Sequence, residues 1–406
     1  MKMTISSPDG LGDFILRIPM LRALHDQGHE LQLFLREPAA SLAAEVFPEC
    51  EIHVISADPN DESVRKKKNP FSKEHALIRS FQPDLYVVCL FSLSFFDEVW
   101  MERENAGIPI AGFTTADVFW PSGTNADPKE VSERFTIKVE VPVSLPELEK
   151  NRLLGSKILG IDLPKTTPEL RPSSASLDAA REILESHGLK EREYWVACMG
   201  GRSGLRMKDW GEMNWKIFLE SVLPGADLPV LFLGNPKEWE SIERIRSGSI
   251  HSVNLAASPP SIPVSQALVA LSSGYLGRDS GVMHMAAASR RPVLAAYGGG
   301  HWGRFLPSSG PALAVTQSMS CQMCHFYCPY EQPHCITGIT MESMLSAWEK
   351  LQSVRGVEIM EQSTDPVLET VRGEEALEFS MNRDAELKRS ASVARSSGLL
   401  QRLFGK

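Results

Sequence analysis

Residues 274–297 decide the fold, and they read GYLGRDSGVMHMAAASRRPVLAAY. An apolar strand over 274–278 leads through a polar turn into an alanine-rich helix over 281–289, and another apolar strand follows at 293–297. This order predicts a parallel βαβ unit. Ser280 is a good N-cap, and Gly281 lets a ligand approach the bare N–H groups at the positive end of the helix, as a diphosphate requires. We expect His284 beside this ligand, although an N-cap with a core histidine would give the same pattern.

The chain opens with a similar strand, turn and helix. A strand over 3–7 and the turn Pro8-Asp9-Gly10-Leu11-Gly12 precede a helix over 13–27. Asp13 stands in the first helical turn, where the helix dipole is expected to keep its carboxyl ionised. An ionised carboxylate at the mouth of a cleft can act as a general base towards a hydroxyl. The alternative is that Asp13 only complements the helix dipole.

Two further glycine-containing turns follow predicted strands. Residues 200–210 read GGRSGLRMKDW, and the glycines and cations, with Arg202, Gly204 and Lys208 among them, suggest a phosphate cradle. The stretch matches neither a Walker loop nor G-x-G-x-x-G, and a loop with solvated charges is the alternative. The turn over 234–238 ends the next strand. Because the carboxyl ends of parallel strands meet at one edge of a sheet, three neighbouring turns offer polar groups to one crevice.

Alternating strands and helices divide the chain into two α/β halves. We expect an N-terminal domain over 1–162, a linker over 163–174, a C-terminal domain over 175–356 and a polar extension over 357–406. The end of the extension reads LLQRLF at 399–404 and suits either an amphipathic surface anchor or a helix docked on its own domain.

Composition limits the class of protein and of partner. The 406 residues are 43% apolar and 23% charged, which is typical of globular proteins and excludes a disordered chain, a collagen or a disulfide-stapled miniprotein. A net charge of −9 disfavours nucleic acid as a partner. The longest apolar stretch, 85–96, is too short to span a bilayer, and the N-terminus lacks the pattern of a signal peptide. We therefore expect a cytoplasmic protein with reduced thiols.

Four of the seven cysteines crowd into a short segment: Cys321, Cys324, Cys328 and Cys335. Their spacing, Cys-x2-Cys-x3-Cys-x6-Cys, can supply four thiolates to a tetrahedral Zn²⁺ or Fe ion. Four reduced thiols in a loop are the alternative. A metal bound here is expected to be structural.

Three groups of residues, in order along the chain, resemble the heptosyltransferase family of glycosyltransferases, family 9. The first is Gly12-Asp13 with Pro19 and residues 21–24, the second is Gly204 with Lys208 and Trp210, and the third is Asp279-Ser280-Gly281-x-x-His284 with the residues that follow to 298. The resemblance covers roughly residues 5–345 and implies a GT-B fold, which has two facing Rossmann-like, doubly wound domains. It also implies an ADP-sugar donor, inversion at the anomeric carbon and no catalytic metal ion.

Carried over by position, the resemblance makes Asp13 the candidate base and Gly12 beside it a donor-binding residue. The donor diphosphate would be held by Arg202, Gly204, Lys208, Asp279, Ser280, Gly281 and His284, and Glu238 would bind the donor ribose. A subgroup that modifies autotransporters is similar in having a Cys-bound iron. The implied acceptor is a glycan or glycolipid such as the lipopolysaccharide core, and a lipid-linked acceptor would bring peripheral contact with the inner membrane.

Other functions remain open at this stage. A nucleotide-sugar epimerase or hydrolase on the same fold would release nucleotide without an acceptor. The cysteine cluster is also consistent with a metal or redox protein. A nonenzymatic regulator would bind nucleotide without needing Asp13. A dehydrogenase is disfavoured because no G-x-G-x-x-G follows the first strand.

Overall fold

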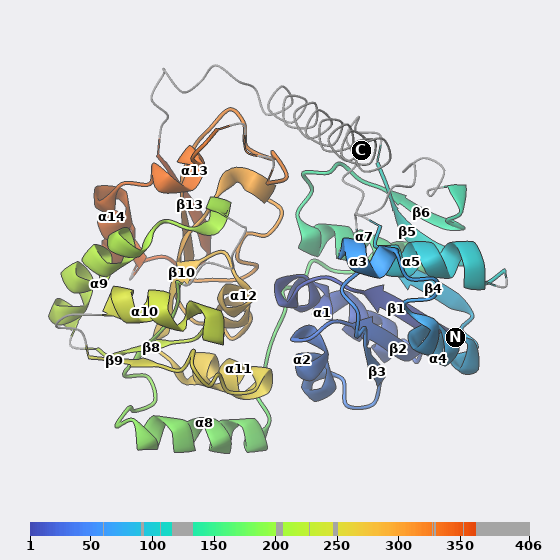
Figure 1. Ribbon diagram of the computed structural model, residues 1–406, viewed down its shortest axis with the longest axis horizontal. Helices are drawn as coiled ribbons and strands as arrows, with labels where there is room; N and C mark the ends of the chain where they lie inside the picture. Colours follow the sequence, from blue (N-terminus) through green and yellow to red (C-terminus); the bar gives the residue numbers. More distant parts are fainter. Residues whose placement is uncertain are drawn as a thin grey trace, which may run out of the picture.

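Each half of the chain forms its own β-sheet, because short apolar strands alternate with helices that cover both faces. The computed structural model describes residues 1–59, 61–90, 93–105, 107–115, 133–199, 206–226, 228–246, 251–326, 328, 330–351 and 353–362. Within these ranges the strand pairings are all parallel, in a six-stranded sheet and a seven-stranded sheet. The two sheets lie side by side (Figure 1). This is the α/β class expected from the sequence.

The first half carries the sheet with strand order β3-β2-β1-β4-β5-β6. Its strands are β1 (Lys2–Ser7), β2 (Glu30–Leu35), β3 (Glu51–Val54), β4 (Leu85–Val88), β5 (Ile110–Thr114) and β6 (Ile137–Glu140). Its helices are α1 (Leu11–Asp26), α2 (Ala39–Val46), α3 (Glu62–Arg65), α4 (Ser72–Phe81), α5 (Phe95–Val99), the π-helical turn η1 (Trp100–Glu104) and α7 (Glu147–Leu159).

The second half has the order β13-β12-β11-β10-β7-β8-β9. Its strands are β7 (Trp195–Cys198), β8 (Val230–Phe232), β9 (Ser252–Asn254), β10 (Gly274–Arg278), β11 (Val293–Ala296), β12 (Ala312–Gln317) and β13 (Val357–Gln362). Its helices are α8 (Ser174–Ser186), α9 (Glu212–Ala226), α10 (Trp239–Arg246), α11 (Ile262–Leu271), α12 (Gly281–Ala288), α13 (His334–Thr337) and α14 (Met341–Leu351), with 3₁₀ turns η2 (Arg206–Lys208), η3 (Pro236–Glu238) and η4 (Gly299–His301).

The strand orders place one switch point in each sheet. In the first sheet the order reverses between β1 and β4, and in the second between β7 and β10. Ligands of open α/β sheets bind outside the carboxyl ends of the strands at such points. The helices that begin there are α1, after β1, and α12, after β10.

The two halves are packed against each other at these helices. One apolar cluster runs through the junction and includes Phe14 and Ile15 of α1 together with Met283 and Ala286 of α12. Residues 160–173 join the halves without a helix or strand, and Leu170 donates its N–H to the carbonyl of Ala288 at 3.1 Å.

Two boundaries differ from the sequence-based expectation. Helix α1 begins at Leu11, so Asp13 is the third residue of the helix instead of the first. Residues 357–362, expected in the polar extension, form β13 and pair with β12. The remainder of the extension, 363–406, lies outside the described residues. None of the helices in the described ranges combines the length and apolar character that a bilayer crossing requires.

Candidate active site

Asp13 lies at the N-terminus of α1, directly beyond the carboxyl end of β1. Its Oδ2 accepts a hydrogen bond from the N–H of Gly10 at 3.2 Å. The side chain is half-buried, and burial together with the nearby Asp9 carboxylate raises the pKa of Asp13 to about 7, against a smaller lowering effect of Arg17. The sequence argument that the helix dipole keeps Asp13 ionised is therefore incomplete, because burial and Asp9 act in the opposite direction. A carboxyl whose pKa lies near neutrality is well suited to general base catalysis.

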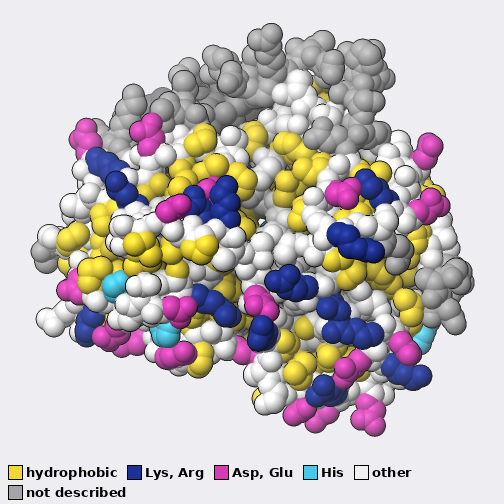
Figure 2. Space-filling model, turned by 180° about the vertical axis from the view of Figure 1, so that it is seen from behind, with side chains coloured by type: hydrophobic (Ala, Val, Ile, Leu, Met, Phe, Trp, Pro, Cys, Tyr) yellow, Lys and Arg dark blue, Asp and Glu magenta, His cyan; other side chains and the backbone are white. Residues whose placement is uncertain are grey.

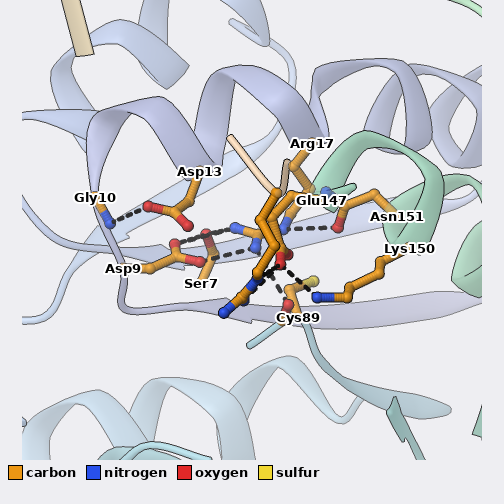
Figure 3. Close-up of polar contacts among 10 residues, drawn as sticks. Ser7, Asp9, Gly10, Asp13, Arg17, Cys89, Glu147, Lys150 and Asn151 are labelled. Atoms are coloured by element: carbon orange, nitrogen blue, oxygen red, sulfur yellow. Dashed lines mark hydrogen bonds and ion pairs between the residues drawn. The ribbon is translucent and has the colours of Figure 1, made fainter. Parts of the chain in front are cut away.

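A buried guanidinium organises the turn that carries Asp13. Arg17 is only 1% exposed and forms a two-point ion pair with Asp9, at 3.0 Å to Oδ1 and 2.8 Å to Oδ2. It also donates to the Ser7 hydroxyl, to the carbonyl of Cys89 at 3.2 Å and to Oδ1 of Asn151 at 3.3 Å (Figure 3). Through these contacts, Arg17 of α1 links the end of β1, the turn before α1, the residue after β4 and α7.

The turn between β10 and α12 brings several predicted donor-binding residues together. The Ser280 hydroxyl accepts from the N–H of Met283 at 3.3 Å and so caps α12, as expected. The Tyr275 hydroxyl lies 2.7 Å from the carbonyl of Arg278 and 3.1 Å from the Ser280 hydroxyl, which fixes the turn. Lys208, the last residue of η2, pairs with Oδ2 of Asp279 at 2.5 Å, so η2 lies next to the β10–α12 turn.

His284 is buried at this site and uncharged. It is 2% exposed, and burial lowers its pKa to about 4 despite the nearby Asp279 carboxylate. Its Nδ1 has no hydrogen-bond partner among the described residues. A neutral imidazole can donate from one nitrogen and accept at the other.

Glu238 lies at the end of η3, which follows β8, and β7 separates β8 from β10 in the sheet. It is 5% exposed, and its Oε2 accepts from the N–H of Asn235 at 2.9 Å. Its Oε1 accepts from Arg278 at 3.3 Å, a residue that directly precedes Asp279. The expected ribose-binding carboxylate is therefore fixed in place beside the β10–α12 turn.

The N-termini of α1 and α12 touch across the junction. A Cβ at Gly12 would lie 2.7 Å from Cδ2 of His284, and a Cβ at Gly281 would lie 2.9 Å from Cδ2 of Leu11. At the N-terminus of each helix, a glycine thus packs against a larger side chain of the other helix. Asp13 of the first half is one residue away from this contact.

An ion pair also crosses the junction beside Asp13. Arg304, from the loop after η4, donates from Nε and Nη2 to Oε1 of Glu147 at 2.8 and 2.5 Å. Lys150 donates to the same oxygen at 2.7 Å, and the N–H of Glu147 donates to the carbonyl of Arg304 at 3.0 Å. All three side chains are buried.

The structure thus gathers most of the predicted residues at one junction, namely Gly12, Asp13, Lys208, Asp279, Ser280, Gly281 and His284, with Glu238 alongside. Arg202 and Gly204 lie outside the described residues. Sequence reasoning missed the charged residues Asp9, Arg17, Glu147, Lys150, Arg278 and Arg304. The one available signal was Glu147 and Lys150, which are spaced to meet on one helix face.

The cysteine cluster is assembled but is not arranged as a metal site. Cys321, Cys324, Cys328 and Cys335 line one small cavity that also borders Met207, the neighbour of Lys208. Burial raises the pKa of the Cys321 and Cys324 thiols to about 12. Across the described part of the chain, no three His, Cys, Asp or Glu side chains are placed to hold a metal ion. The expected metal centre is therefore not supported by the structure.

A larger cavity, of about 470 Å³, lies along α1 beyond its first turn. It is lined by one side of α1 from Leu16 to Asp26, by the start of α7 and by residues of the connection over 163–169. Asn151 is part of the lining, and its Nδ2 has no hydrogen-bond partner among the residues described. None of the predicted site residues borders this cavity.

Comparisons with solved structures identify the class of fold. E. coli ADP-heptose LPS heptosyltransferase II superposes with a TM-score of 0.64 at 16% identity, covering 86% of this chain and 98% of that one. E. coli heptosyltransferase WaaC with ADP-2-deoxy-2-fluoro heptose gives 0.58 at 17% identity, covering 86% and 99%. The iron-containing dodecameric glycosyltransferase TibC from enterotoxigenic E. coli gives 0.52 at 13% identity, covering 87% and 78%. The two sheets with their facing helices are thus a GT-B fold.

The family follows from the sequence match. The model of glycosyltransferase family 9 (heptosyltransferase) matches residues 127–332, just over half of the chain. The protein belongs to this family and is a glycosyltransferase. A search among curated proteins gives no match.

Proposed function

We propose that the protein is an inverting, metal-independent glycosyltransferase that moves heptose, or a related sugar, from an ADP-sugar to a glycan such as the lipopolysaccharide core. The observation that carries the proposal is the contact between the N-termini of α1 and α12, which places the Asp13 carboxyl next to a helix end suited to a diphosphate. The first half would hold the acceptor and the second half the donor. The solved structures named above support ADP-heptose as the donor to test.

In this mechanism Asp13 takes the proton from the acceptor hydroxyl. The oxygen attacks the anomeric carbon as the bond from that carbon to the diphosphate oxygen breaks, and attack opposite the leaving group inverts the configuration. A pKa of about 7 lets a large fraction of Asp13 be ionised at neutral pH while the carboxylate stays basic enough to accept the proton.

The leaving nucleoside diphosphate gathers negative charge in the transition state. The N–H groups at the start of α12, after Ser280, and the Lys208 cation would stabilise that charge more in the transition state than in the ground state. Asp279 pairs with Lys208 at 2.5 Å, which holds the cation next to the start of α12. Arg202 and Gly204 would extend the same cradle, and Glu238 would accept hydrogen bonds from the donor ribose.

Turnover of ADP-heptose with truncated lipopolysaccharide acceptors, followed by mass spectrometry, tests the proposal. We expect a product that gains one heptose, with NMR showing an inverted anomeric configuration. D13N should lower kcat by about 10²–10⁴-fold, the usual contribution of a general base. D26N is the matched control, because Asp26 is exposed at the far end of the same helix. Nucleotide release that does not depend on acceptor would contradict transfer.

We also propose that any metal bound by the four cysteines is structural, since the chemistry above asks only for a base and a diphosphate site. Elemental analysis of the purified protein and of C321S tests this separately from catalysis. Where a metal is found, we expect C321S to lose it together with thermal stability, while the remaining folded protein still consumes donor. Donor consumption that rises and falls with the metal content of the folded protein would overturn it.

A further inference from the structure

The cavity of about 470 Å³ beside α1 borders none of the residues predicted to bind the donor or to act as the base. It is enclosed by residues 16–26 of α1, by the start of α7 and by the connection between the two halves. Its apolar walls include Pro19, Met20 and Ala23 of α1 and Leu148 of α7. A cavity of this size, with apolar walls and a few polar groups, is the usual form of a small-molecule site.

A buried amide in this lining lacks a hydrogen-bond acceptor. Asn151 of α7 is 2% exposed, and its Oδ1 accepts from Nε of Arg17 at 3.3 Å (Figure 3). Because Nε of an arginine can only donate, this bond fixes which end of the amide faces Arg17. The other end, Nδ2, is left without an acceptor among the residues that the structure describes. A buried donor left unsatisfied is costly and rare in native proteins, and a ligand oxygen in the cavity would satisfy it.

The exposed part of the lining carries two cations, Arg22 and Lys165. Neither of them forms an ion pair within the described part of the chain. The lining carboxylates Glu149 and Glu169 are paired with other arginines, and Asp26 is largely exposed beside a histidine. Figure 2 shows Lys and Arg side chains next to hydrophobic ones around the middle of the face opposite to that of Figure 1, where the two halves meet. The cavity therefore combines apolar walls with positive charge that a ligand can use.

We propose that this cavity is a binding site for a small amphipathic anion, a molecule with an aliphatic body and one carboxylate or phosphate group. The aliphatic body would cover the apolar walls. An oxygen of the anionic group would accept from Asn151, and the flexible side chains of Arg22 and Lys165 would neutralise its charge. The site is separate from those of donor and acceptor, so the proposal does not depend on the transfer reaction.

A ligand in this cavity would contact three segments that the fold joins nowhere else by one molecule: α1, α7 and the connection between the halves. The connection is itself fixed to the second half, because the N–H of Leu170 donates to the carbonyl of Ala288 at the end of α12. Binding is therefore expected to slow hydrogen exchange of the backbone over 163–169, and to leave the β10–α12 turn unchanged.

Titration calorimetry with octanoate tests the proposal, because octanoate has an aliphatic chain and a single carboxylate. We expect saturable binding of one octanoate per chain. Acetate has the charge without the chain and should show no saturable binding, since it covers almost none of the apolar wall. 1-Octanol has the chain without the charge and should bind about tenfold more weakly than octanoate, because the cations and the amide would face no anion.

Variants of the lining locate the site. R22M and K165M should each weaken octanoate binding about two- to fivefold, the usual contribution of an exposed ion pair. N151D keeps an oxygen for Arg17 and replaces the N–H donor by an acceptor, so it should weaken binding by about tenfold or more. A23F fills the cavity and should abolish binding. K157M is the control, because Lys157 is an exposed lysine of α7 that does not line the cavity.

Three results would overturn the proposal. The first is the absence of saturable octanoate binding to the wild type. The second is binding that R22M and K165M weaken no more than K157M does, and these three surface substitutions keep the test decisive should A23F or N151D fold poorly. The third is displacement of octanoate by ADP, which would place octanoate in the donor site instead of the cavity. Binding that survives saturating ADP, weakens in R22M and K165M and slows exchange over 163–169 supports the proposal.

Discussion

Asp13 is held in a position that costs stability. Its carboxyl is half-buried beside another carboxylate, Asp9, and the only side-chain hydrogen bond it accepts among those described is from the N–H of Gly10. The unfolded chain would ionise this group at its ordinary pKa of 3.8, whereas the folded protein does so at about 7. Between these values the folded state keeps a proton that the unfolded state has released, so stability falls as the pH rises.

Replacing Asp13 by Asn should therefore stabilise the protein at alkaline pH. The amide still accepts from Gly10 but has no charge to bury, and a pKa difference of one corresponds to about 1.4 kcal/mol, so we expect a gain of about 1–3 kcal/mol at about pH 8. The gain should disappear near pH 4, where the carboxyl is protonated in both states. Thermal unfolding of wild type and D13N at the two pH values measures this. An equal change at both values would show that burial of the charge is not the cause.

Arg17 shows why part of the site escaped sequence reasoning. An arginine among apolar residues of a helix looks like a surface side chain, yet this one is 1% exposed because Asp9, Ser7 and Asn151 satisfy it. Asn151 is distant in sequence, and Asp9 precedes the helix. The partners become visible only when the turn, α1 and α7 are placed together.

At the scale of elements, strand–turn–helix units were the most predictable part. The sequence placed a helix over 281–289 with Ser280 as its cap, and the structure has α12 over Gly281–Ala288 with that cap. Helix α7 was missed, and its buried face explains why: it contains Glu147, Lys150 and Asn151 beside Leu154 and Gly155. A helix that buries charged and amide groups lacks the apolar period by which helices are recognised.

The cap of α12 is expected to have a second role that other caps lack. S280A should cost about 0.5–2 kcal/mol of stability through the lost cap. It should also weaken ADP-sugar binding, because the helix end at this turn would no longer be held for the diphosphate. S261A is the matched control, since Ser261 caps α11 in the same way by accepting from the N–H of Val264. Unfolding and donor KM measured for both variants decide the matter. If S261A raises KM as much as S280A, the effect is one of general stability.

At the scale of the whole molecule, the sequence predicts two parallel α/β sheets. It does not predict how the two halves meet. The contacts that build the site join residues far apart in sequence, such as Gly12 with His284 and Glu147 with Arg304. No local pattern encodes which helix ends meet. The edge strand β13 was hidden for a related reason, because its residues mix apolar and polar types without a regular alternation and lead into a polar tail.

Binding of nucleotide should stabilise the whole molecule through the second half. ADP at about 100 times its Kd would add about 2.7 kcal/mol to the free energy of unfolding. K208M should lose most of the accompanying rise in Tm, because it removes the cation next to Asp279. K157M, which removes an exposed lysine of α7, should show the same rise in Tm as the wild type. Thermal scans with and without ADP give the result, and an equal rise in K208M would place the diphosphate elsewhere.

The reciprocal packing of Gly12 on His284 and of Gly281 on Leu11 has a consequence for how such a chain changes in evolution. Each glycine sits where even a methyl group would be closer than an ordinary van der Waals contact to a side chain from the other half. A larger residue at either position would hold the halves apart unless its partner became smaller at the same time. The two pairs are therefore expected to covary among relatives, even though each pair spans more than 200 positions of sequence, and to drift far more slowly than the surfaces on either side of them.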